Sequence, residues 1–328
     1  MLSTISQTAT SGPHTLTLSD VERDEFRGLA EQLATTAPAL IDHPAWVDAA
    51  RELSCRIPLS LREAVRAYRH DPGEGGTLLL RNLPVDEATL PPTPAVAESV
   101  ERAAAVPAAV AVLVTLNLGE LASYREEKAG ALVQNVVPVP GRETSQSNAG
   151  SHPLELHVEN AFHPHRPDYV GLLCLRHDRA GTAGTLVSSI RKALGLLPAD
   201  VREVLHGRRF TTAPPPSFHG GDAVPLHAVL SGDPEDPNVQ VDFHVTHAVD
   251  DEGKIALEHL RDAFIAASQS VVLSSGDMAF VDNRVAIHGR SAFQPTYDGR
   301  DRWLHRTFAH LDRRRTRGHR PGDTNVLS

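Results

Sequence analysis

The pentapeptide Leu156-His157-Val158-Glu159-Asn160 places an imidazole two residues before a carboxylate. Side chains two residues apart on a β-strand point to the same face, so a strand here would present His157 and Glu159 side by side. Such a pair is common in surface strands and is weak evidence of a site when it stands alone. Whether the pair belongs to a functional site depends on which other residues of the chain lie on the same face.

Short strands are predicted around this segment, because apolar or β-branched runs recur there between Gly, Pro and Asp residues. These runs cover residues 131–139, 154–159, 169–176, 184–190, 239–244, 277–282 and 303–310, with helices expected between them at 199–207 and 252–270. The first third of the chain is predicted to be helical. Ser19-Asp-Val-Glu22 and Ser60-Leu-Arg-Glu63 each fit a capping box, with helices at 20–36 and 61–69. This order favours an α+β protein built on a β-sandwich or jelly roll.

His288 offers a third ligand, because Asp282-Asn-Arg-Val-Ala-Ile-His288 follows an apolar predicted strand and precedes a glycine turn. Two neutral imidazoles and one carboxylate form the facial triad that suits non-haem Fe(II) and leaves positions open for a cosubstrate and O₂. Zinc is more often held in a closed tetrahedral site or in a hydrolytic site with one open position. A Zn-dependent hydrolase on a cupin-like barrel is therefore the alternative from another class, although the sequence has no HExxH motif.

Arg302 lies fourteen residues after His288, just before the predicted strand 303–310. If that strand pairs back toward the strand of His288, the guanidinium reaches the metal pocket and can bind the distal carboxylate of a 2-oxo acid in bidentate fashion. Each feature alone has an ordinary structural explanation, and Arg302 alone could be a surface residue at a strand start. All of them in this order and spacing favour an oxygenase that uses Fe(II) and a 2-oxo acid.

The composition of the whole chain bears on which classes of protein function and which cellular locations are expected. Its 328 residues are 41% hydrophobic, and 32 Lys and Arg against 41 Asp and Glu give a net charge of −9, which argues against a general nucleic-acid binder. The two cysteines lack CxxC spacing, so a reducing compartment is expected. The N-terminus does not read as a signal peptide, and the longest apolar stretch, 103–116, is too short to span a bilayer. We expect a cytoplasmic protein without nucleic-acid or membrane partners.

The chain resembles the clavaminate synthase-like branch of the Fe(II)/2-oxoglutarate oxygenases, and within it the group containing asparagine oxygenase and the arginine β-hydroxylases. The resemblance runs from about Thr77 to Arg313 and is most specific in four stretches, at residues 130–141, 157–169, 281–290 and 301–308. It implies a double-stranded β-helix (jelly roll) core with flanking N-terminal and inserted helices. It also implies Fe(II) as cofactor, with 2-oxoglutarate and O₂ as cosubstrates.

The resemblance also implies roles for individual residues. His157, Glu159 and His288 would bind iron, and Arg302 would bind the 5-carboxylate of 2-oxoglutarate with help from the Thr185 hydroxyl. The α-carboxylate and α-amino groups of the substrate would be held by Arg306, Glu127, Gln134 and Asn148. Such a clamp implies a free amino acid, because a carrier-bound acyl group has no carboxylate to offer Arg306.

By the same resemblance, Asp242 matches the position that contacts the far end of the substrate side chain. A carboxylate there accepts hydrogen bonds from an amide, ammonium or guanidinium and repels another carboxylate. Arginine hydroxylases carry a second Asp two residues later, where this chain has His244. The resemblance therefore implies hydroxylation of an unactivated carbon, at Cβ, of a free L-amino acid with a polar or basic side chain, for peptide natural products such as antibiotics. Related halogenases lack the carboxylate at Glu159, so its presence favours hydroxylation. Desaturation, cyclisation or a carrier-bound substrate are the alternatives within the family.

The chain is expected to divide into three segments. Residues 1–14 are predicted to be disordered, residues 15–312 to form a single oxygenase domain, and the basic segment 313–328 to be a flexible tail.

Overall fold

Strand β16 (Trp303–His310) sends alternate side chains into two separate buried environments. Leu304 and Phe308 belong to one apolar cluster, whereas Trp303 and Ala309 belong to another. A strand shows this period of two when both faces of its sheet are covered. The computed structural model that shows this describes residues 14–218 and 224–328.

The larger of two main sheets has nine strands, in the order β1-β2-β14-β7-β16-β4-β17, with β5 paired to β16 and β3 paired to β5. Strand β7 (Tyr169–Arg176) lies antiparallel between β14 and β16. The other strands are β1 (His14–Thr17), β2 (Thr77–Arg81), β3 (Val100–Glu101), β4 (Glu120–Tyr124), β5 (Val133–Val136), β14 (Met278–Asp282) and β17 (Val326–Leu327).

The smaller sheet has four strands in the order β13-β8-β15-β6, all antiparallel to their neighbours. They are β6 (Leu154–His157), β8 (Gly184–Ser189), β13 (Gln269–Val272) and β15 (Ala286–Arg290). Two further antiparallel pairs are formed by β9 (Phe210–Thr212) with β12 (Thr246–Ala248), and by β10 (Leu230–Asp233) with β11 (Asp236–Val239).

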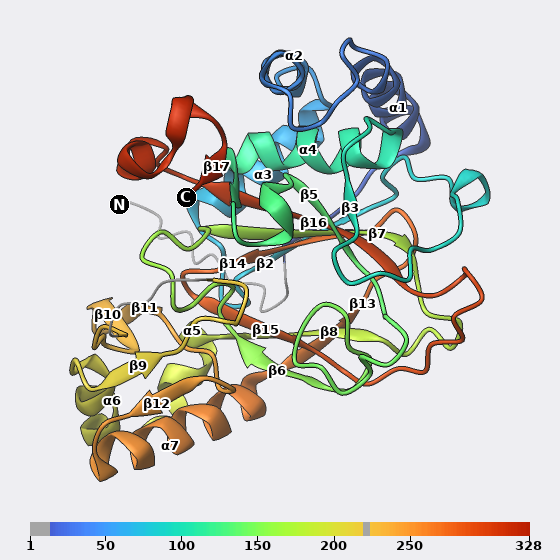
Figure 1. Cartoon of the computed structure of the whole chain (residues 1–328). Helices are drawn as coiled ribbons and strands as arrows, with labels where there is room; N and C mark the ends of the chain where they lie inside the picture. Colours follow the sequence, from blue (N-terminus) through green and yellow to red (C-terminus); the bar gives the residue numbers. More distant parts are fainter. Residues whose placement is uncertain (1–13, 219–223) are drawn as a thin grey trace, which may run out of the picture.

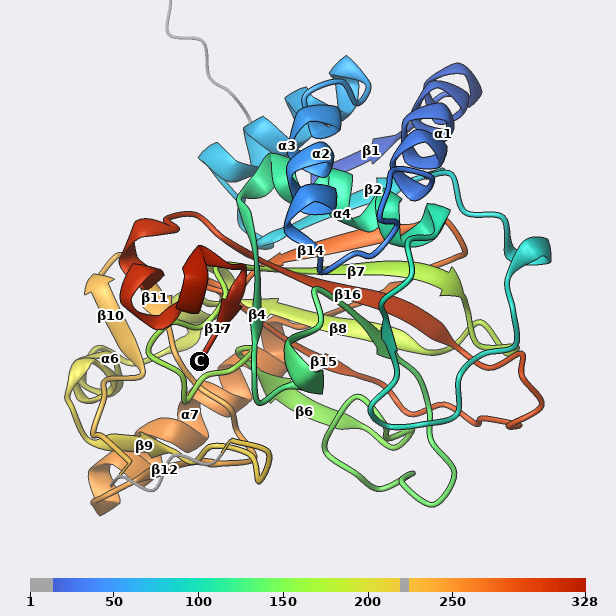
Figure 2. The ribbon, with the colours of Figure 1, turned by 45° about the horizontal axis from the view of Figure 1, so that its top comes forward.

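Helices cover the outer face of each main sheet, as Figures 1 and 2 show. On the larger sheet, Phe26 and Trp46 of the N-terminal helices join the apolar cluster that includes Leu173 of β7. On the smaller sheet, Phe264 joins the cluster of Ile287 in β15, and its carbonyl accepts a hydrogen bond of 2.7 Å from the Ser188 hydroxyl. The helices are α1 (Asp20–Ala34), α2 (Pro44–Ser54), α3 (Leu59–His70), α4 (Val106–Leu118), α5 (Ile190–Ala193), α6 (Ala199–His206) and α7 (Asp251–Ala267), with 3-10 turns η1 (Glu87–Thr89), η2 (Lys128–Gly130), η3 (Leu194–Leu196), η4 (Arg314–His319) and η5 (Pro321–Asp323).

The inner faces of the two sheets line a common cavity. Leu172, Leu304 and Arg306 reach it from the larger sheet, and His157 and His288 reach it from the smaller one. The protein thus has mixed α and β content, and both sheets contribute polar side chains to the cavity between them.

Two N-terminal predictions had different outcomes. The capping box of Ser19 and Glu22 is present at the start of α1, where the Ser19 hydroxyl accepts from the Glu22 amide. The box at Ser60 is wrong, because α3 begins at Leu59 and no side chain caps it. The Ser60 hydroxyl donates instead to the Glu22 carboxylate of α1, so a tertiary contact replaces the local one. Helix α2 has no counterpart among the predicted helices.

Of the predictions for the two chain ends, only the C-terminal one falls mainly on described residues. The N-terminal prediction falls on residues outside those described, except for His14, which begins β1. The basic segment 313–328 was predicted to be flexible, but it forms η4, η5 and strand β17, which pairs in parallel with β4. The Asn325 amide nitrogen donates to the Leu121 carbonyl at 2.6 Å, which adds a side-chain bond to that pairing. Among the described residues, no helix combines the length and apolar character that a membrane span requires.

Candidate functional site

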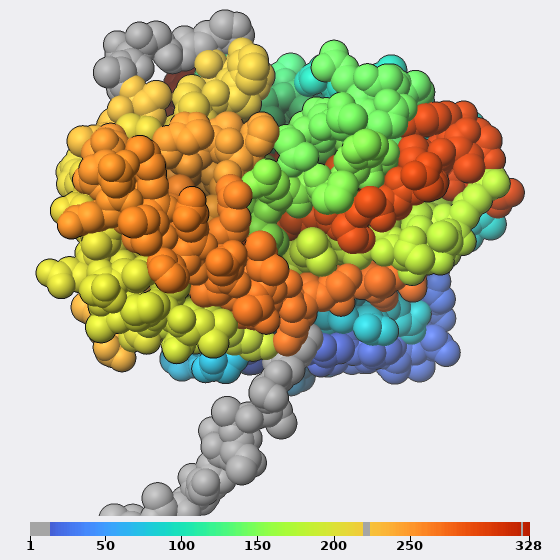
Figure 3. Space-filling view, turned by 90° about the horizontal axis from the view of Figure 1, so that it is seen from below, coloured from blue at the N-terminus to red at the C-terminus, as the bar shows by residue number. Residues whose placement is uncertain are grey.

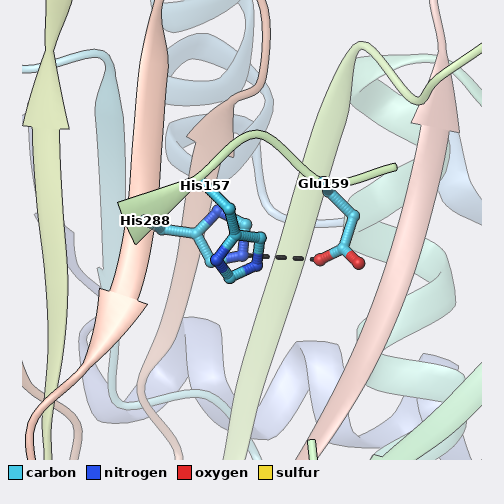
Figure 4. A group of neighbouring side chains, drawn as sticks. All are labelled: His157, Glu159 and His288. Atoms are coloured by element: carbon cyan, nitrogen blue, oxygen red, sulfur yellow. Dashed lines mark ion pairs between the residues drawn. The ribbon is translucent and has the colours of Figure 1, made fainter. Parts of the chain in front are cut away.

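Two histidines on neighbouring strands form the base of the site. His157 ends β6 and lies opposite His288 of β15, with ring centroids 4.4 Å apart. His288 therefore lies inside a strand, and not beyond one as the sequence suggested. Glu159 completes the group from the loop after β6, with its Oε2 3.4 Å from His288 Nε2 (Figure 4). One ligand atom from each of the three residues lies within 4.8 Å of the others.

Glu159 is held by a residue that the sequence analysis missed. Strand β6 ends at His157, so the predicted strand geometry does not place Glu159. The buried side chain of Asn283 does so instead, because its Oδ1 accepts from the Glu159 amide at 2.8 Å and its Nδ2 donates to the Glu159 carbonyl at 3.0 Å. Asn283 stands in the turn between β14 and β15, within a stretch that was singled out only for His288.

The ionisation of the three side chains suits a cation. Burial acts to raise the pKa of the Glu159 carboxyl, but the charge of Arg306 and a hydrogen bond with His288 hold that pKa well below its usual range. Burial, and then the neighbouring His157, lowers the pKa of His288. A neutral imidazole and an ionised carboxylate are the protonation states that bind metals.

The imidazoles are also oriented for a ligand role. His157 Nδ1 lies 2.8 Å from the Glu155 carbonyl, which is the type of contact that fixes the tautomer and directs Nε2 into the site. The buried Nδ1 of His288 has no hydrogen-bond partner among the described residues. The geometry, burial and donor set of the three residues together fit a divalent metal ion.

Arg302 lies in the same cavity, but not by the predicted strand pairing. Strand β16 pairs with β4, β5 and β7 of the larger sheet, whereas β15 belongs to the smaller one. Arg302 precedes β16 and lines the cavity together with Thr185 of β8 and the metal-site residues. Its residue exposure is 6%, and no carboxylate within residues 14–218 and 224–328 forms an ion pair with it. A buried cation without an ion pair is stabilised when an anion enters its cavity.

Arg306 connects the metal site to a set of polar side chains at its edge. Its Nη1 donates to Glu159 Oε1 at 2.8 Å and to Asn148 Oδ1 at 3.3 Å. Its Nε donates to Gln134 Oε1 at 3.1 Å, and its Nη2 forms an ion pair with Glu127. Burial raises the pKa of Glu127, although the charge of Arg306 opposes this. The amide nitrogen of Gln134 is buried and has no partner among the described residues.

A second, larger cavity opens beside the first. It has a volume of about 590 Å³ and shares His157, Glu159, Asn148 and Arg306 with the cavity of Arg302. This volume falls within the roughly 300–1,000 Å³ typical of small-molecule sites. Asp242 and His244 also line it, and the Asp242 Oδ1 accepts from the His244 amide at 2.9 Å.

The structure brings the predicted site residues together. The cavities are lined by every one of them except Gln134, which contacts Arg306. The segment 140–152 between β5 and β6 supplies Asn148 and other lining residues. Residues Pro214–Phe218 also line the larger cavity. Arg290 lines the smaller cavity and had no predicted role.

Comparison with protein-family models gives one decisive match. The model described as taurine catabolism dioxygenase TauD, TfdA family matches residues 42–308, which is most of the chain. The chain belongs to this family.

This TauD/TfdA family chain has well-characterised relatives. It is 47% identical to L-asparagine oxygenase of Streptomyces coelicolor, with 95% of this chain and 94% of the relative covered. It is 36% identical to clavaminate synthase 2 of Streptomyces clavuligerus, over 93% of this chain and 96% of the relative. A solved structure of asparagine oxygenase in complex with Fe(II), 2S,3S-3-hydroxyasparagine and succinate matches with a TM-score of 0.93 at 45% identity, covering 96% of this chain and 99% of that one. The resemblance to the clavaminate synthase-like branch is thus confirmed.

Proposed function

We propose that this protein is an Fe(II)- and 2-oxoglutarate-dependent dioxygenase that hydroxylates Cβ of a free L-amino acid, with L-asparagine as the first candidate. The observation that carries the proposal is the placement of a three-residue metal site, a buried Arg302 without an acidic partner and the Arg306 cluster on one pair of joined cavities. The identity of 47% to an L-asparagine oxygenase supports the choice of substrate.

The metal would be held by His157, Glu159 and His288. Two imidazoles and one carboxylate are the donor set of non-haem Fe(II) oxygenases, and they leave positions open for other ligands. When bound, Fe(II) would supply the oxidative chemistry that couples decarboxylation of 2-oxoglutarate to insertion of one oxygen atom of O₂ into a C–H bond. Glu159 stays ionised in this site because its pKa is held low by Arg306 and His288 against the effect of burial.

The cosubstrate would be oriented by Arg302 and Thr185. The guanidinium offers two parallel donors to the 5-carboxylate, and the Thr185 hydroxyl on β8 offers another. Because Arg302 is buried and has no ion pair among the described residues, a carboxylate that enters the cavity gains a partner without displacing an existing one. Leu172 and Leu304 line the same cavity and give it apolar walls.

The amino acid would be oriented by the cluster around Arg306. Its α-carboxylate would pair with the Arg306 guanidinium, and its ammonium group would lie near Glu127, Gln134 and Asn148. An ammonium group beside Glu127 would also counter the rise in the pKa of that carboxyl that burial causes. With the α-carboxylate and the ammonium group of the amino acid held in this way, the Cβ hydrogens would face the metal site.

Selection of the side chain would rest on Asp242, with His244 beside it. Asp242 forms an isolated bridge with His157, so its position is tied to the metal site. A carboxylate there accepts hydrogen bonds from a terminal amide and repels a terminal carboxylate, which favours asparagine over aspartate. The roles of all eleven side chains are therefore proposals that rest on their placement.

We further propose that the two sheets form the distorted double-stranded β-helix of this oxygenase class and that residues 15–312 form one domain. The support is the cavity between the sheets and the TM-score of 0.93 to asparagine oxygenase. A role in peptide natural-product biosynthesis follows from the same proposal, because hydroxylated amino acids are building blocks of such peptides.

The test is a turnover screen of free L-amino acids with Fe(II), ascorbate and 2-oxoglutarate. We expect succinate and a product one oxygen atom heavier, with L-asparagine the preferred substrate. A product that has lost two hydrogens would indicate desaturation or cyclisation instead. Turnover of a carrier-tethered amino acid but of no free one would contradict the role of Arg306, and turnover that requires Zn(II) but not 2-oxoglutarate would contradict the oxygenase.

A further inference from the structure

Two buried arginines lie on the wall of the smaller cavity, and the proposed function uses only one of them. Arg290 of β15 is 4% exposed and Arg302 is 6% exposed. Both guanidinium carbons lie close to the ring of Phe293, at 5.7 and 5.8 Å from its centroid. Within the described part of the chain, neither has an ion pair with a carboxylate, so two like charges share one desolvated region.

Arg290 differs from Arg302 in what it holds. Its Nη2 donates to the His152 carbonyl at 3.0 Å, and its Nη1 contacts the Ser147 carbonyl at 3.3 Å. Its Nε is buried and has no hydrogen-bond partner among the described residues. One guanidinium thus reaches from the wall of the cosubstrate cavity to the segment 140–152.

That segment is part of the amino-acid cavity. It carries Asn148, whose Oδ1 accepts from Arg306 at 3.3 Å, and other residues of it line the larger cavity. It is docked by a second contact from the same region, because the Phe293 amide donates to the Ser151 carbonyl at 3.0 Å. In Figure 3 the green surface of this segment lies beside the red-orange chain that follows β15.

We propose that Arg290 is a positioning residue that couples the two cavities: a dicarboxylate bound at Arg302 holds Arg290 in place, and Arg290 then holds the segment 140–152 over the amino acid. This inference rests on the proposed function. Its physical basis is that the buried positive charges of Arg290 and Arg302 repel each other until an anion enters the cavity. A bound anion offsets this repulsion, so that the anion and the docked segment stabilise each other. By linkage, each ligand then raises the affinity for the other by the same factor.

The first experiment measures binding to the Fe(II) protein without oxygen. We expect 2-oxoglutarate to raise the affinity for the amino acid about fivefold to tenfold in the wild type, which is at the low end of the usual coupling between two ligand sites. Arg290→Lys keeps the charge but cannot reach both carbonyls, so the coupling factor should fall toward one while 2-oxoglutarate still binds.

Arg176→Lys is the matched control. Arg176 is 6% exposed, against 4% for Arg290, and it also donates to backbone carbonyls, such as that of Gly299 at 3.1 Å, but it lines neither cavity. We expect its coupling factor to equal that of the wild type. A wild-type factor in Arg290→Lys, or an equal loss in both variants, would overturn the inference.

A second measurement needs no variant. Hydrogen exchange of the wild-type Fe(II) protein should show slower exchange at the Gly150, Ser151 and His152 amides when 2-oxoglutarate is added, because these amides close the turns of the segment. Unchanged exchange would overturn the coupling. If the wild-type Fe(II) protein fails to bind 2-oxoglutarate at all, it is the proposed function that fails, so the two failures are distinguishable.

Discussion

Replacing Asn283 with alanine should remove the side chain that holds the backbone of Glu159, the proposed metal ligand. The Asn283 side chain makes three buried hydrogen bonds: to the amide and the carbonyl of Glu159, at 2.8 and 3.0 Å, and to the Pro167 carbonyl at 2.9 Å. Asn283→Ala leaves these three backbone groups without partners. An unsatisfied buried group costs about 1–3 kcal/mol, so three of them should lower the free energy of unfolding by at least about 3 kcal/mol.

The same change should weaken metal binding, because loss of a group that orients a metal ligand typically costs about 10–100-fold in affinity. The assay is competition between the protein and a coloured chelator for Co(II), together with denaturant unfolding of the metal-free protein. Asn135→Ala is the matched control. Asn135 is equally buried and also makes three side-chain hydrogen bonds, to Ser99, Glu101 and Trp303, but none to a proposed ligand.

We expect both variants to be destabilised, and only Asn283→Ala to lose metal affinity. Wild-type affinity in Asn283→Ala would refute the reasoning, since Glu159 would then be placed by something other than Asn283.

Three further predictions test other parts of the structure. Burial lowers the pKa of His163 to about 4, below its ordinary value of about 6.5. The folded protein should therefore lose up to about 3 kcal/mol of stability as the pH drops from about 6.5 toward 4, and His163→Gln should make the denaturant midpoint less dependent on pH over this range. The Thr115 hydroxyl lies 2.8 Å from that of Thr307, so Thr115→Val should cost about 1–2 kcal/mol in thermal or denaturant unfolding, and adding Thr307→Val should cost less than the sum of the two single changes. Asp242→Asn should raise kcat/KM for aspartate relative to asparagine by at least about tenfold, and an unchanged ratio would remove Asp242 from substrate selection.

Local patterns in the sequence predict most strands of the site, but not all. Strands β7 and β16 have the predicted bounds, whereas β15, which places His288 opposite His157 of β6, was not predicted as a strand. Each predicted strand carries its own signal of apolar residues between turn residues, and this signal needs no knowledge of the fold. The facial triad could therefore be predicted from residue types and order along the chain.

Features set by long-range contacts could not be predicted in this way. Glu159 lies outside its predicted strand because Asn283, 124 residues away, takes its backbone groups. Arg302 reaches the metal site from the opposite sheet, and nothing near it in the sequence specifies which strand will be its neighbour. Ser60 has the pattern of a capping box but bonds to Glu22, 38 residues away. For Glu159 and Ser60 a tertiary partner replaces the local interaction, and for Arg302 the order of strands in the two sheets decides the neighbours.

An oxygenase of the proposed kind inserts oxygen from O₂ into an amino acid while it consumes 2-oxoglutarate. The most direct measurement is turnover of L-asparagine with 2-oxoglutarate and Fe(II) under isotopically labelled O₂, followed by mass spectrometry of both products. We expect one labelled oxygen atom in the hydroxylated amino acid and one in succinate, in equal amounts. Label in neither product, or an amino acid whose new oxygen comes from water, would contradict the account.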